Sequence, residues 1–202
     1  MSKAELPGPV VLASKSPERR RLLAGIIPRF QVVVPGVDES KIDGENPDET
    51  ARKRAQAKAR QVAGERPDAL VIAADTVVEC EGRLLGKPRD REHARRMLRT
   101  LGSRPHSVVT ALCVVTPDGR EATRVAATEM HMKEFTEEQI EHYASQPGAL
   151  ERAGVYALQH PDPNVRRIEG NPSCVQGLPL EELDEILESL YPASRAERSC
   201  ED

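Results

Sequence analysis

The stretch LVIAADTVV, residues 70–78, decides the fold class of this chain. Its first five residues are all apolar, which is typical of a β-strand that is covered on both faces. Val77 and Val78 extend the apolar run beyond an interruption at Asp75 and Thr76. A strand of this kind needs helices on both sides of its sheet. The stretch therefore predicts an α/β fold, and it places a carboxylate inside that fold.

Helix-start signals lie on both sides of this strand along the chain. A polar side chain that accepts from the first backbone N–H groups marks such a start, often with proline next to it. We expect helices that begin near Ser16, Asn46, Asp90, Thr136 and Glu181. Further strands are expected over residues 10–12, 30–34 and 107–115, and from the turn at 117–119 to about Phe135. Strand–helix–strand units and an antiparallel hairpin both occur, which predicts a mixed sheet.

The length and composition of the chain favour one unit and exclude several function classes. We expect a single domain over residues 1–191, followed by a polar C-terminal tail at 192–202. A net charge of −4 gives no general affinity for nucleic acid, and three Tyr, two Phe and no Trp offer no platform for stacking bases. The four cysteines form no C-x-x-C pair, and no long apolar run occurs near the N-terminus. We therefore expect no zinc site, no signal peptide, no membrane span and a cytoplasmic location.

Asp75 is the first candidate for chemistry. A carboxylate beside a buried strand is costly unless it has partners or a task. It suits a general base or a metal ligand that the strand holds rigidly, whereas the alternative is a carboxylate that caps a turn. Lys87, on the stiff turn Gly86-Lys87-Pro88, and Lys58, on an alanine-rich helix, suit contacts with phosphate. The alternative for both lysines is plain exposure to solvent.

Arg19, Arg20 and Arg21 lie in the first turns of the helix that begins after Ser16. Cations are unfavourable there because the helix macrodipole is positive at its N-terminus. A bound phosphate would remove this conflict, since backbone N–H groups and guanidinium forks both suit it. Alternatively, the arginines are simply solvated.

Asp38 and Glu39 lie in a polar loop, where carboxylates either bind a divalent cation or remain solvated. The chain contains neither G-x-x-x-x-G-K-[ST] nor G-x-G-x-x-G, so a P-loop or Rossmann phosphate site is not predicted. The set as a whole combines an acid in a buried strand, cations at helix starts and turns, and loop acids. It predicts a ligand that carries phosphate and leaves hydrolysis of that ligand open.

The segment LASKSPERRRLL, residues 12–23, resembles the opening motif of the Maf family of nucleotide pyrophosphatases, LASxSPxRRxLL. Further blocks that resemble this family follow in the family's order: VDES, AADTVV, GKPRDREHARRMLRTL, RAGVYALQ and IEGNPSCVQGLPL. Together they cover residues 10 to about 190. The resemblance implies a Maf/ITPase-like fold, in which helices flank an elongated mixed sheet and two lobes enclose a central cleft. It also implies a protein that is often a homodimer.

The resemblance further implies hydrolysis of a nucleoside triphosphate to the monophosphate and pyrophosphate, with a divalent cation such as Mg²⁺ or Mn²⁺. Asp75 matches the acid that is proposed as the base for the attacking water. Glu39, with Asp75, matches the acids that suit the metal. The positions that line the family's phosphate site correspond here to Ser14, Arg19, Arg20, Lys58 and Lys87.

Base specificity is implied by a smaller set. Thr76 and Gln159 resemble the branch of the family that acts on dTTP and UTP, with modified pyrimidine nucleotides as further candidates. Glu18 departs from this branch, which usually carries arginine there, and Arg152 replaces a usual lysine. Two alternatives therefore stay open. One is a nucleotide-binding regulator of cell division without turnover, and the other is a nucleotidyltransferase-like protein, although the chain lacks the glycine-rich loop that the latter needs.

Overall fold

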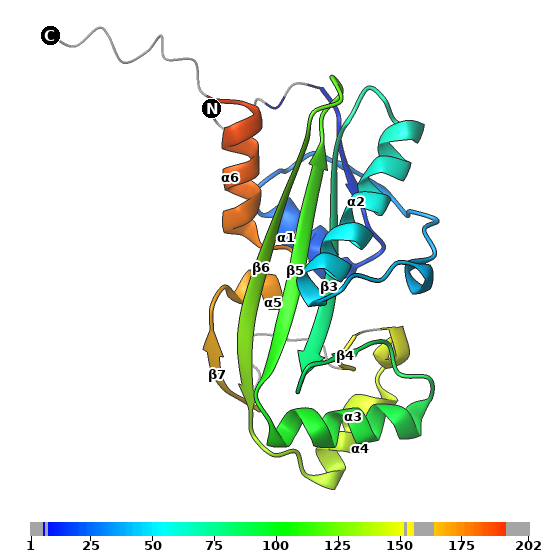
Figure 1. The fold of residues 1–202 in the computed structure, drawn as a ribbon, viewed down its shortest axis with the longest axis vertical. Helices are drawn as coiled ribbons and strands as arrows, with labels where there is room; N and C mark the ends of the chain where they lie inside the picture. Colours follow the sequence, from blue (N-terminus) through cyan, green and yellow to red (C-terminus); the bar gives the residue numbers. More distant parts are fainter. Residues whose placement is uncertain (1–5, 7, 152, 156–163, 193–202) are drawn as a thin grey trace, which may run out of the picture.

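The computed structural model of the chain describes residue 6 and residues 8–151, 153–155 and 164–192 (Figure 1). The stretch LVIAADTVV lies within strand β3 (Leu70–Cys80). All of its residues are buried except Thr76, which is half-buried. The prediction of a strand covered on both faces is therefore confirmed.

The strands form one seven-stranded mixed sheet in the order β2-β1-β3-β5-β6-β7, with β4 paired to β3 outside that path. Its other members are β1 (Val10–Ala13), β2 (Gln31–Val33), β4 (Arg83–Leu85), β5 (His106–Val115), β6 (Glu121–Met132) and β7 (Val165–Glu169). Strands β2, β1 and β3 run parallel to one another, and the remaining pairings are antiparallel. The predicted hairpin is the β5–β6 pair, so the predicted mixed sheet is confirmed.

Six α-helices and two short 3₁₀ turns complete the described fold. They are α1 (Pro17–Ala24), α2 (Pro47–Glu65), α3 (Arg91–Ser103), α4 (Glu137–Ser145), α5 (Pro172–Val175), α6 (Leu180–Leu190), η1 (Glu39–Lys41) and η2 (Ala149–Glu151). The predicted caps are present: the side chains of Ser16, Asn46, Asp90 and Thr136 each accept a hydrogen bond from a backbone N–H in the first turn. The sequence patterns had not predicted β7 or α5.

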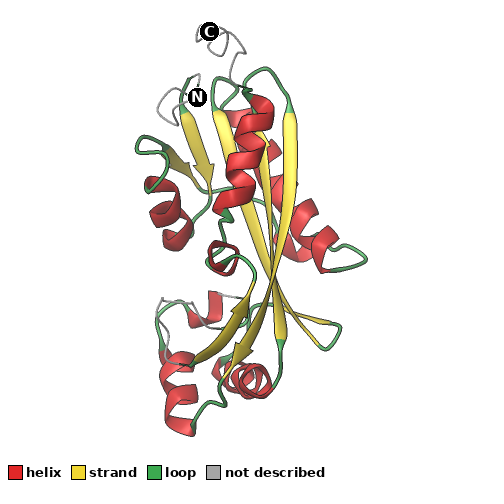
Figure 2. Ribbon diagram, turned by 90° about the vertical axis from the view of Figure 1, so that its left-hand side faces the viewer, coloured by secondary structure: helices red, strands yellow, loops and turns green. Residues whose placement is uncertain are grey.

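Buried apolar side chains of the described residues form three clusters, which explain the elongated shape. One lies between α2 and one face of the sheet, and a second lies between the opposite face and helices α1 and α6. The third joins α3 and α4 to the far ends of β3, β5 and β6. The helices therefore gather in two groups along the long strands, as the two-lobed expectation required (Figure 2).

Strand β3 has an unpaired edge between these two groups. Its pairing with β1 ends at Ala73, and its pairing with β4 begins at Val78. Residues 74–77 thus have no strand beside them on that side in the described structure, while β5 pairs with them on the other side. We call residues 74–77 the open edge of β3.

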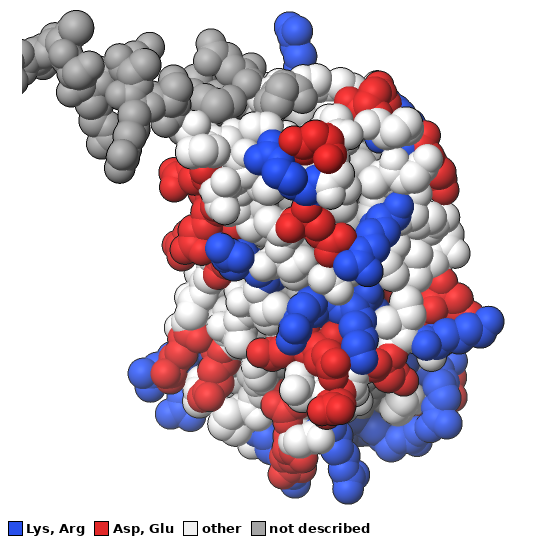
Figure 3. All heavy atoms as spheres, turned by 45° about the horizontal axis from the view of Figure 1, so that its top comes forward, with Lys and Arg blue, Asp and Glu red and all other residues white. Residues whose placement is uncertain are grey.

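Two properties of the surface bear on partners. Among the described helices, none has the length and apolar character that a membrane crossing requires. On the face that Figure 3 presents, Lys and Arg side chains are interspersed with Asp and Glu and form no broad basic field. This mixture agrees with the net charge of −4 and does not indicate a nucleic-acid surface on that face. The polar tail and the single domain over residues 1–191 remain predictions, since residues 193–202 lie outside the described part.

Candidate active site

Asp75 and Thr76 lie next to each other on the open edge of β3 but face opposite sides of the sheet, because side chains alternate along a strand. The buried side chain of Asp75 meets α2, where it contacts Lys58. Thr76 meets Arg19 of α1 on the other side. The candidate site therefore has two halves, and each half is built by a different helix.

The first half is a row of alternating charges that we call the ion-pair chain: Asp75, Lys58, Glu39 and Lys87. Lys58 Nζ lies 2.6 Å from Asp75 Oδ1 and 2.7 Å from Glu39 Oε1. Lys87 Nζ lies 3.2 Å from Glu39 Oε2. Lys58 comes this close to the strand because its neighbours on α2 are small and fully buried, namely Ala51, Ala55 and Ala59.

Asp75 combines burial with an unused oxygen. Only 4% of the residue is exposed, and its Oδ2 atom has no hydrogen-bond partner in the described structure. Burial raises the pKa of Asp75, whereas Lys58 and Arg19 oppose that rise and Glu39 adds to it. The carboxylate is thus held beside cations by one oxygen, and the other oxygen is left to accept a proton or bind a cation.

Glu39 behaves differently because both of its oxygens are engaged. Burial acts to raise the pKa of Glu39, but the charges and hydrogen bonds of Lys58 and Lys87 outweigh it and lower the pKa to about 2. Glu39 therefore remains ionised at any working pH. Its role in the described structure is to hold the two lysines beside Asp75.

The second half is a line of hydrogen bonds that we call the hydroxyl chain: Arg19, Thr76, Thr110 and the carbonyl of Cys174. Arg19 Nη2 donates to Thr76 Oγ1 at 2.9 Å, and the two threonine hydroxyls lie 2.9 Å apart. Thr110 Oγ1 then donates to the Cys174 carbonyl at 2.8 Å. Thr76 and Thr110 are direct register partners on β3 and β5, so strand pairing itself places them together.

Arg19 is fixed further by backbone carbonyls. Its Nε donates to Gly177 O and its Nη1 donates to Ala74 O, both at 2.8 Å. Gly177 has a φ of +92°, and a Cβ there would lie 3.0 Å from Arg19 Nε, so glycine permits both the turn and the close approach. Burial lowers the pKa of Arg19, and Asp75 and Glu39 partly offset this effect.

The two halves meet at the carbonyl of Ala74, the first residue of the open edge. Arg19 donates to it from one side of the sheet, and Lys58 Nζ reaches it at 3.5 Å from the other. A carbonyl without a strand partner thus draws both cations to one point. The arrangement suits an anionic ligand that lies across the open edge with Asp75 beside it.

The remaining predicted phosphate and specificity residues are placed unevenly. Ser14 is buried, and its Oγ accepts from the Ser16 N–H at 3.1 Å and lies 3.5 Å from Arg19 Nη1. Arg20 is exposed, and no side-chain hydrogen bond of Arg20 is found among the described residues. Glu18 accepts from Ser16 Oγ at 3.2 Å, within its own helix turn.

The predictions for Gln159 and Arg152 lie outside the described residues. The structure brings together Asp75, Lys58, Glu39, Lys87, Arg19, Thr76 and Ser14. Their roles remain predictions. Sequence analysis had missed Thr110 and Gly177. A lone threonine within the apolar strand HSVVTALCVV was the available signal for Thr110.

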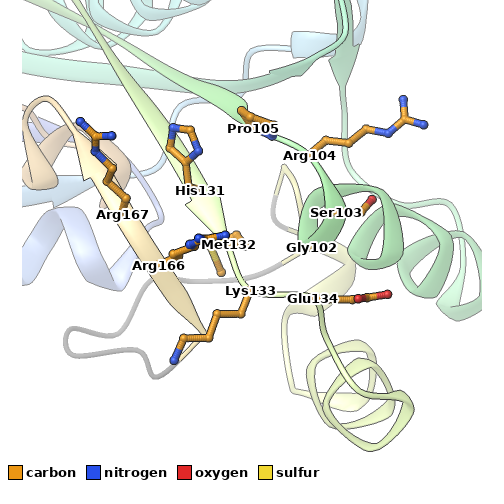
Figure 4. Close-up of a pocket in the computed structure, with 10 residues that line it drawn as sticks. All are labelled: Gly102, Ser103, Arg104, Pro105, His131, Met132, Lys133, Glu134, Arg166 and Arg167. Atoms are coloured by element: carbon orange, nitrogen blue, oxygen red, sulfur yellow. The ribbon is translucent and has the colours of Figure 1, made fainter.

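A second polar region lies at the other end of the sheet, where β6 pairs with β7 (Figure 4). His131 Nε2 lies 2.7 Å from Glu129 Oε1 and 3.6 Å from Glu169 Oε1, and Arg167 Nε lies 2.9 Å from the same Glu169 oxygen. A pocket of about 810 Å³ adjoins this group, and His131 and Arg167 help to line it. The pocket does not include Asp75 or its partners. We interpret the group as a cross-strand network, because each carboxylate already has a nitrogen partner.

Comparisons with known proteins give matches over most of the chain. The family model described as Maf-like protein matches residues 9–190. A dTTP/UTP pyrophosphatase of Akkermansia muciniphila is 40% identical over 183 residues, which cover 90% of this chain and 96% of that protein. A protein of the same name from Salinibacter ruber is 41% identical, with 93% of each chain covered.

Solved structures give a weaker, partial likeness. A nucleoside-triphosphatase / dITP/XTP pyrophosphatase from Mycobacterium abscessus matches with a TM-score of 0.43 and 19% identity, over 61% of this chain and 73% of that one. The Ham1 protein of Staphylococcus aureus matches with a TM-score of 0.42 and 20% identity, over 62% and 72%. The family match spans nearly the whole described fold and the identity to relatives is high, so this chain belongs to the Maf-like protein family.

Proposed function

We propose that this chain hydrolyses dTTP and UTP to the monophosphate and pyrophosphate. The observation that carries the proposal is Asp75 Oδ2, a buried carboxylate oxygen without a described partner, next to Lys58 and close to Arg19. The names of the relatives from Akkermansia muciniphila and Salinibacter ruber supply the substrate class. Modified pyrimidine nucleotides share the same chemistry and belong to the same proposal.

The proposed reaction is the attack of water on the α-phosphorus. A bond forms between the water oxygen and the α-phosphorus, and the bond to the bridging oxygen breaks, so that pyrophosphate leaves with the electron pair. Asp75 Oδ2 orients the water and accepts its proton, a task that a raised pKa favours because the group is then a stronger base. Because Asp75 is buried, bulk solvent has little access to this oxygen, and the attacking water does not compete with other waters for it.

The cations act on the charge of the triphosphate. Arg19 and Lys58 converge on the open edge of β3, and Lys87 continues the row outward to a more exposed position. Ion pairs and backbone carbonyls hold these side chains in place, and donors held in this way neutralise developing negative charge with little reorganisation. Ser14 holds the start of α1 beside them, and Arg20 is the exposed member of the set.

The donor set also fits a divalent cation such as Mg²⁺ or Mn²⁺. Asp75 Oδ2 is a free anionic oxygen, and Glu39 is a second hard oxygen donor once a lysine gives way to the cation. When bound, the cation would supply charge neutralisation on phosphate oxygens and a lower pKa for coordinated water. Asp75 would be its first ligand and Glu39 its second, and with the cation bound Asp75 would act on the water through the cation instead of directly.

A turnover panel tests the proposal. The purified chain is incubated with dTTP, UTP, CTP or 7-methyl-GTP and Mg²⁺, and pyrophosphate and nucleoside monophosphate are measured. We expect dTMP and UMP with equimolar pyrophosphate, and no such product from 7-methyl-GTP. Tight binding of dTTP without any product would refute the proposal in favour of a nucleotide-binding regulator. A homodimer and a cytoplasmic location are separate predictions, and sedimentation of the purified chain checks the first.

A further inference from the structure

The hydroxyl chain has only one possible direction. A guanidinium only donates and a backbone carbonyl only accepts, and each threonine hydroxyl has a single proton. Thr110 Oγ1 donates its proton in a hydrogen bond to the Cys174 carbonyl, 2.8 Å away. Because Thr110 has no second proton, the hydrogen bond between the two hydroxyls must run from Thr76 to Thr110. Thr76 is free to donate in this way, since Arg19 Nη2 only donates to it.

This direction determines what Thr76 can offer to a ligand. Its Oγ1 already accepts from Arg19 and donates to Thr110, which leaves one lone pair and no proton. Thr76 is half-buried on the open edge, so that lone pair is the polar feature its hydroxyl can present there. Toward a ligand, Thr76 is therefore an acceptor only.

We propose that Thr110, which does not touch the ligand, is a positioning residue that sets base selection by locking Thr76 as an acceptor. The inference rests on the proposed function. Uracil and thymine carry a proton on N3, whereas cytosine carries a lone pair at the same ring position. In this proposal the base of the ligand lies against Thr76, which is half-buried on the open edge of β3. In that position an acceptor-only Thr76 attracts the N3–H of uracil or thymine and repels the N3 lone pair of cytosine. The chain should therefore discriminate against CTP.

The surroundings of Thr110 make this lock rigid. The residue is 0% exposed and lies in the middle of β5, with Thr76 directly opposite on β3. Its acceptor, the Cys174 carbonyl, belongs to α5, and the Gly177 carbonyl just beyond α5 holds Arg19 Nε. One short segment thus fixes both ends of the hydroxyl chain. A hydroxyl held in this way cannot rotate to offer its proton to the open edge.

The chain offers a matched control in Thr128 on β6. Thr128 is 1% exposed, and its Oγ1 donates to the Asn171 carbonyl at 3.0 Å. It thus shares with Thr110 the residue type, the burial and a hydrogen bond to a carbonyl at α5. No hydrogen bond joins Thr128 to Arg19 or Thr76 in the described structure. Removal of its hydroxyl should perturb packing near α5 without a change in the direction of the hydroxyl chain.

The test compares Thr110→Val, Thr110→Ser and Thr128→Val with the wild type. For each protein, kcat/KM is measured with UTP and with CTP. Thr110→Val frees the Thr76 proton, so we expect the UTP-to-CTP ratio to fall about tenfold. Thr110→Ser keeps the hydroxyl and should keep the wild-type ratio, as should Thr128→Val. If valine at 110 prevents folding, Thr110→Ala removes the same hydroxyl and takes its place.

Two outcomes would overturn the inference: an unchanged ratio in folded Thr110→Val or Thr110→Ala, or an equal fall in Thr128→Val. The ratio is also measured as dissociation constants of UTP and CTP in the Asp75→Asn background, where turnover is not needed. Binding with the expected ratio but no turnover by the wild type would refute the proposed function and support this inference. Turnover of UTP with an unchanged ratio in the variants would refute only the inference.

Discussion

At the open edge of β3, the neighbouring residues Asp75 and Thr76 face opposite sides of the sheet, and the two sides differ in how completely their polar groups are hydrogen-bonded. On the α2 side, the ion-pair chain leaves Asp75 Oδ2 buried without a partner. On the α1 side, the hydroxyl chain runs without a break from Arg19 to the Cys174 carbonyl, and both threonine protons are engaged in it. The unsatisfied side suits chemistry, because Asp75 is paired with Lys58 through one oxygen and keeps its other buried oxygen for a reacting group. The satisfied side suits recognition, because a fully bonded network holds one geometry.

The two sides also differ in their dependence on charge. The ion-pair chain is held by Coulombic attraction between groups that titrate, so its stability varies with pH. The hydroxyl chain contains no group that titrates near neutral pH. Changes that break the first side should therefore act on rate and on pH dependence, whereas changes that break the second should act on geometry and selection.

The largest expected effect comes from Asp75→Asn, which keeps the shape of the side chain but removes the proposed base and the negative charge beside Lys58. We expect pyrophosphate release to fall about a thousandfold, the range of a positioned general base. The matched control is Asp68→Asn, an exposed carboxylate just before β3, which should keep wild-type activity. Wild-type turnover in Asp75→Asn would remove this residue from the reaction.

The next effect comes from Arg19→Lys, which breaks the other side. An ammonium group cannot reach Gly177 O, Ala74 O and Thr76 Oγ1 together as the planar fork does. We expect kcat/KM to fall about a hundredfold for UTP, as expected when a reacting group is misplaced by about an ångström. Arg21→Lys, an exposed change in the same helix, is the control. An equal fall of kcat/KM in the two variants would show that any exchange of arginine for lysine in α1 lowers activity and that the hydrogen bonds of the Arg19 guanidinium are not the cause.

Glu39→Gln should lower kcat/KM about tenfold, because the lysines lose the carboxylate that holds them in line.

The folded pKa of Glu39 is about 2, below its ordinary value of 4.5. Its contribution to stability is therefore fully present above pH 4.5 and is lost as the pH falls toward 2. Thermal melts between these values should show a steeper decline for the wild type than for the variant. Parallel declines would contradict this assignment.

A more modest effect is expected on the stability of Asp75→Asn. Folding raises the pKa of Asp75, so its stability contribution is fully present below its ordinary value of 3.8 and is lost as the pH rises through the raised value. Asparagine does not ionise, so the melting temperature of the variant should rise relative to that of the wild type as the pH rises. Melting curves across this range measure the difference, and a constant difference would contradict the sign.

The smallest effect is expected from Arg20→Gln, because Arg20 is exposed and belongs to neither chain. We expect KM for UTP to rise a few-fold at low salt with kcat unchanged, since an exposed charge mainly attracts the ligand. The rise should shrink as salt is added. A large fall in kcat would show that Arg20 contacts the reacting phosphate.

The fold was predictable where local signals were strong. Ser16, Asn46, Asp90 and Thr136 begin their helices as expected, because a cap acts within one turn. Strand β7 was missed because VRRIE has no clean alternation, and it forms by pairing with β6. Thr110 and Gly177 were missed because their partners lie far away in the chain, at Thr76 and Arg19.

The amino-acid sequence by itself determined the α/β class, the buried strand that carries Asp75, and the group of acids and cations that suit a phosphate ligand. These follow from periodicity, capping and charge, which act over a few residues. Only the tertiary structure decided that Lys58 and Arg19 approach Ala74 from opposite sides and that Thr76 and Thr110 form one directed line. Strand register and helix packing set these contacts, and both arise from burial between distant segments.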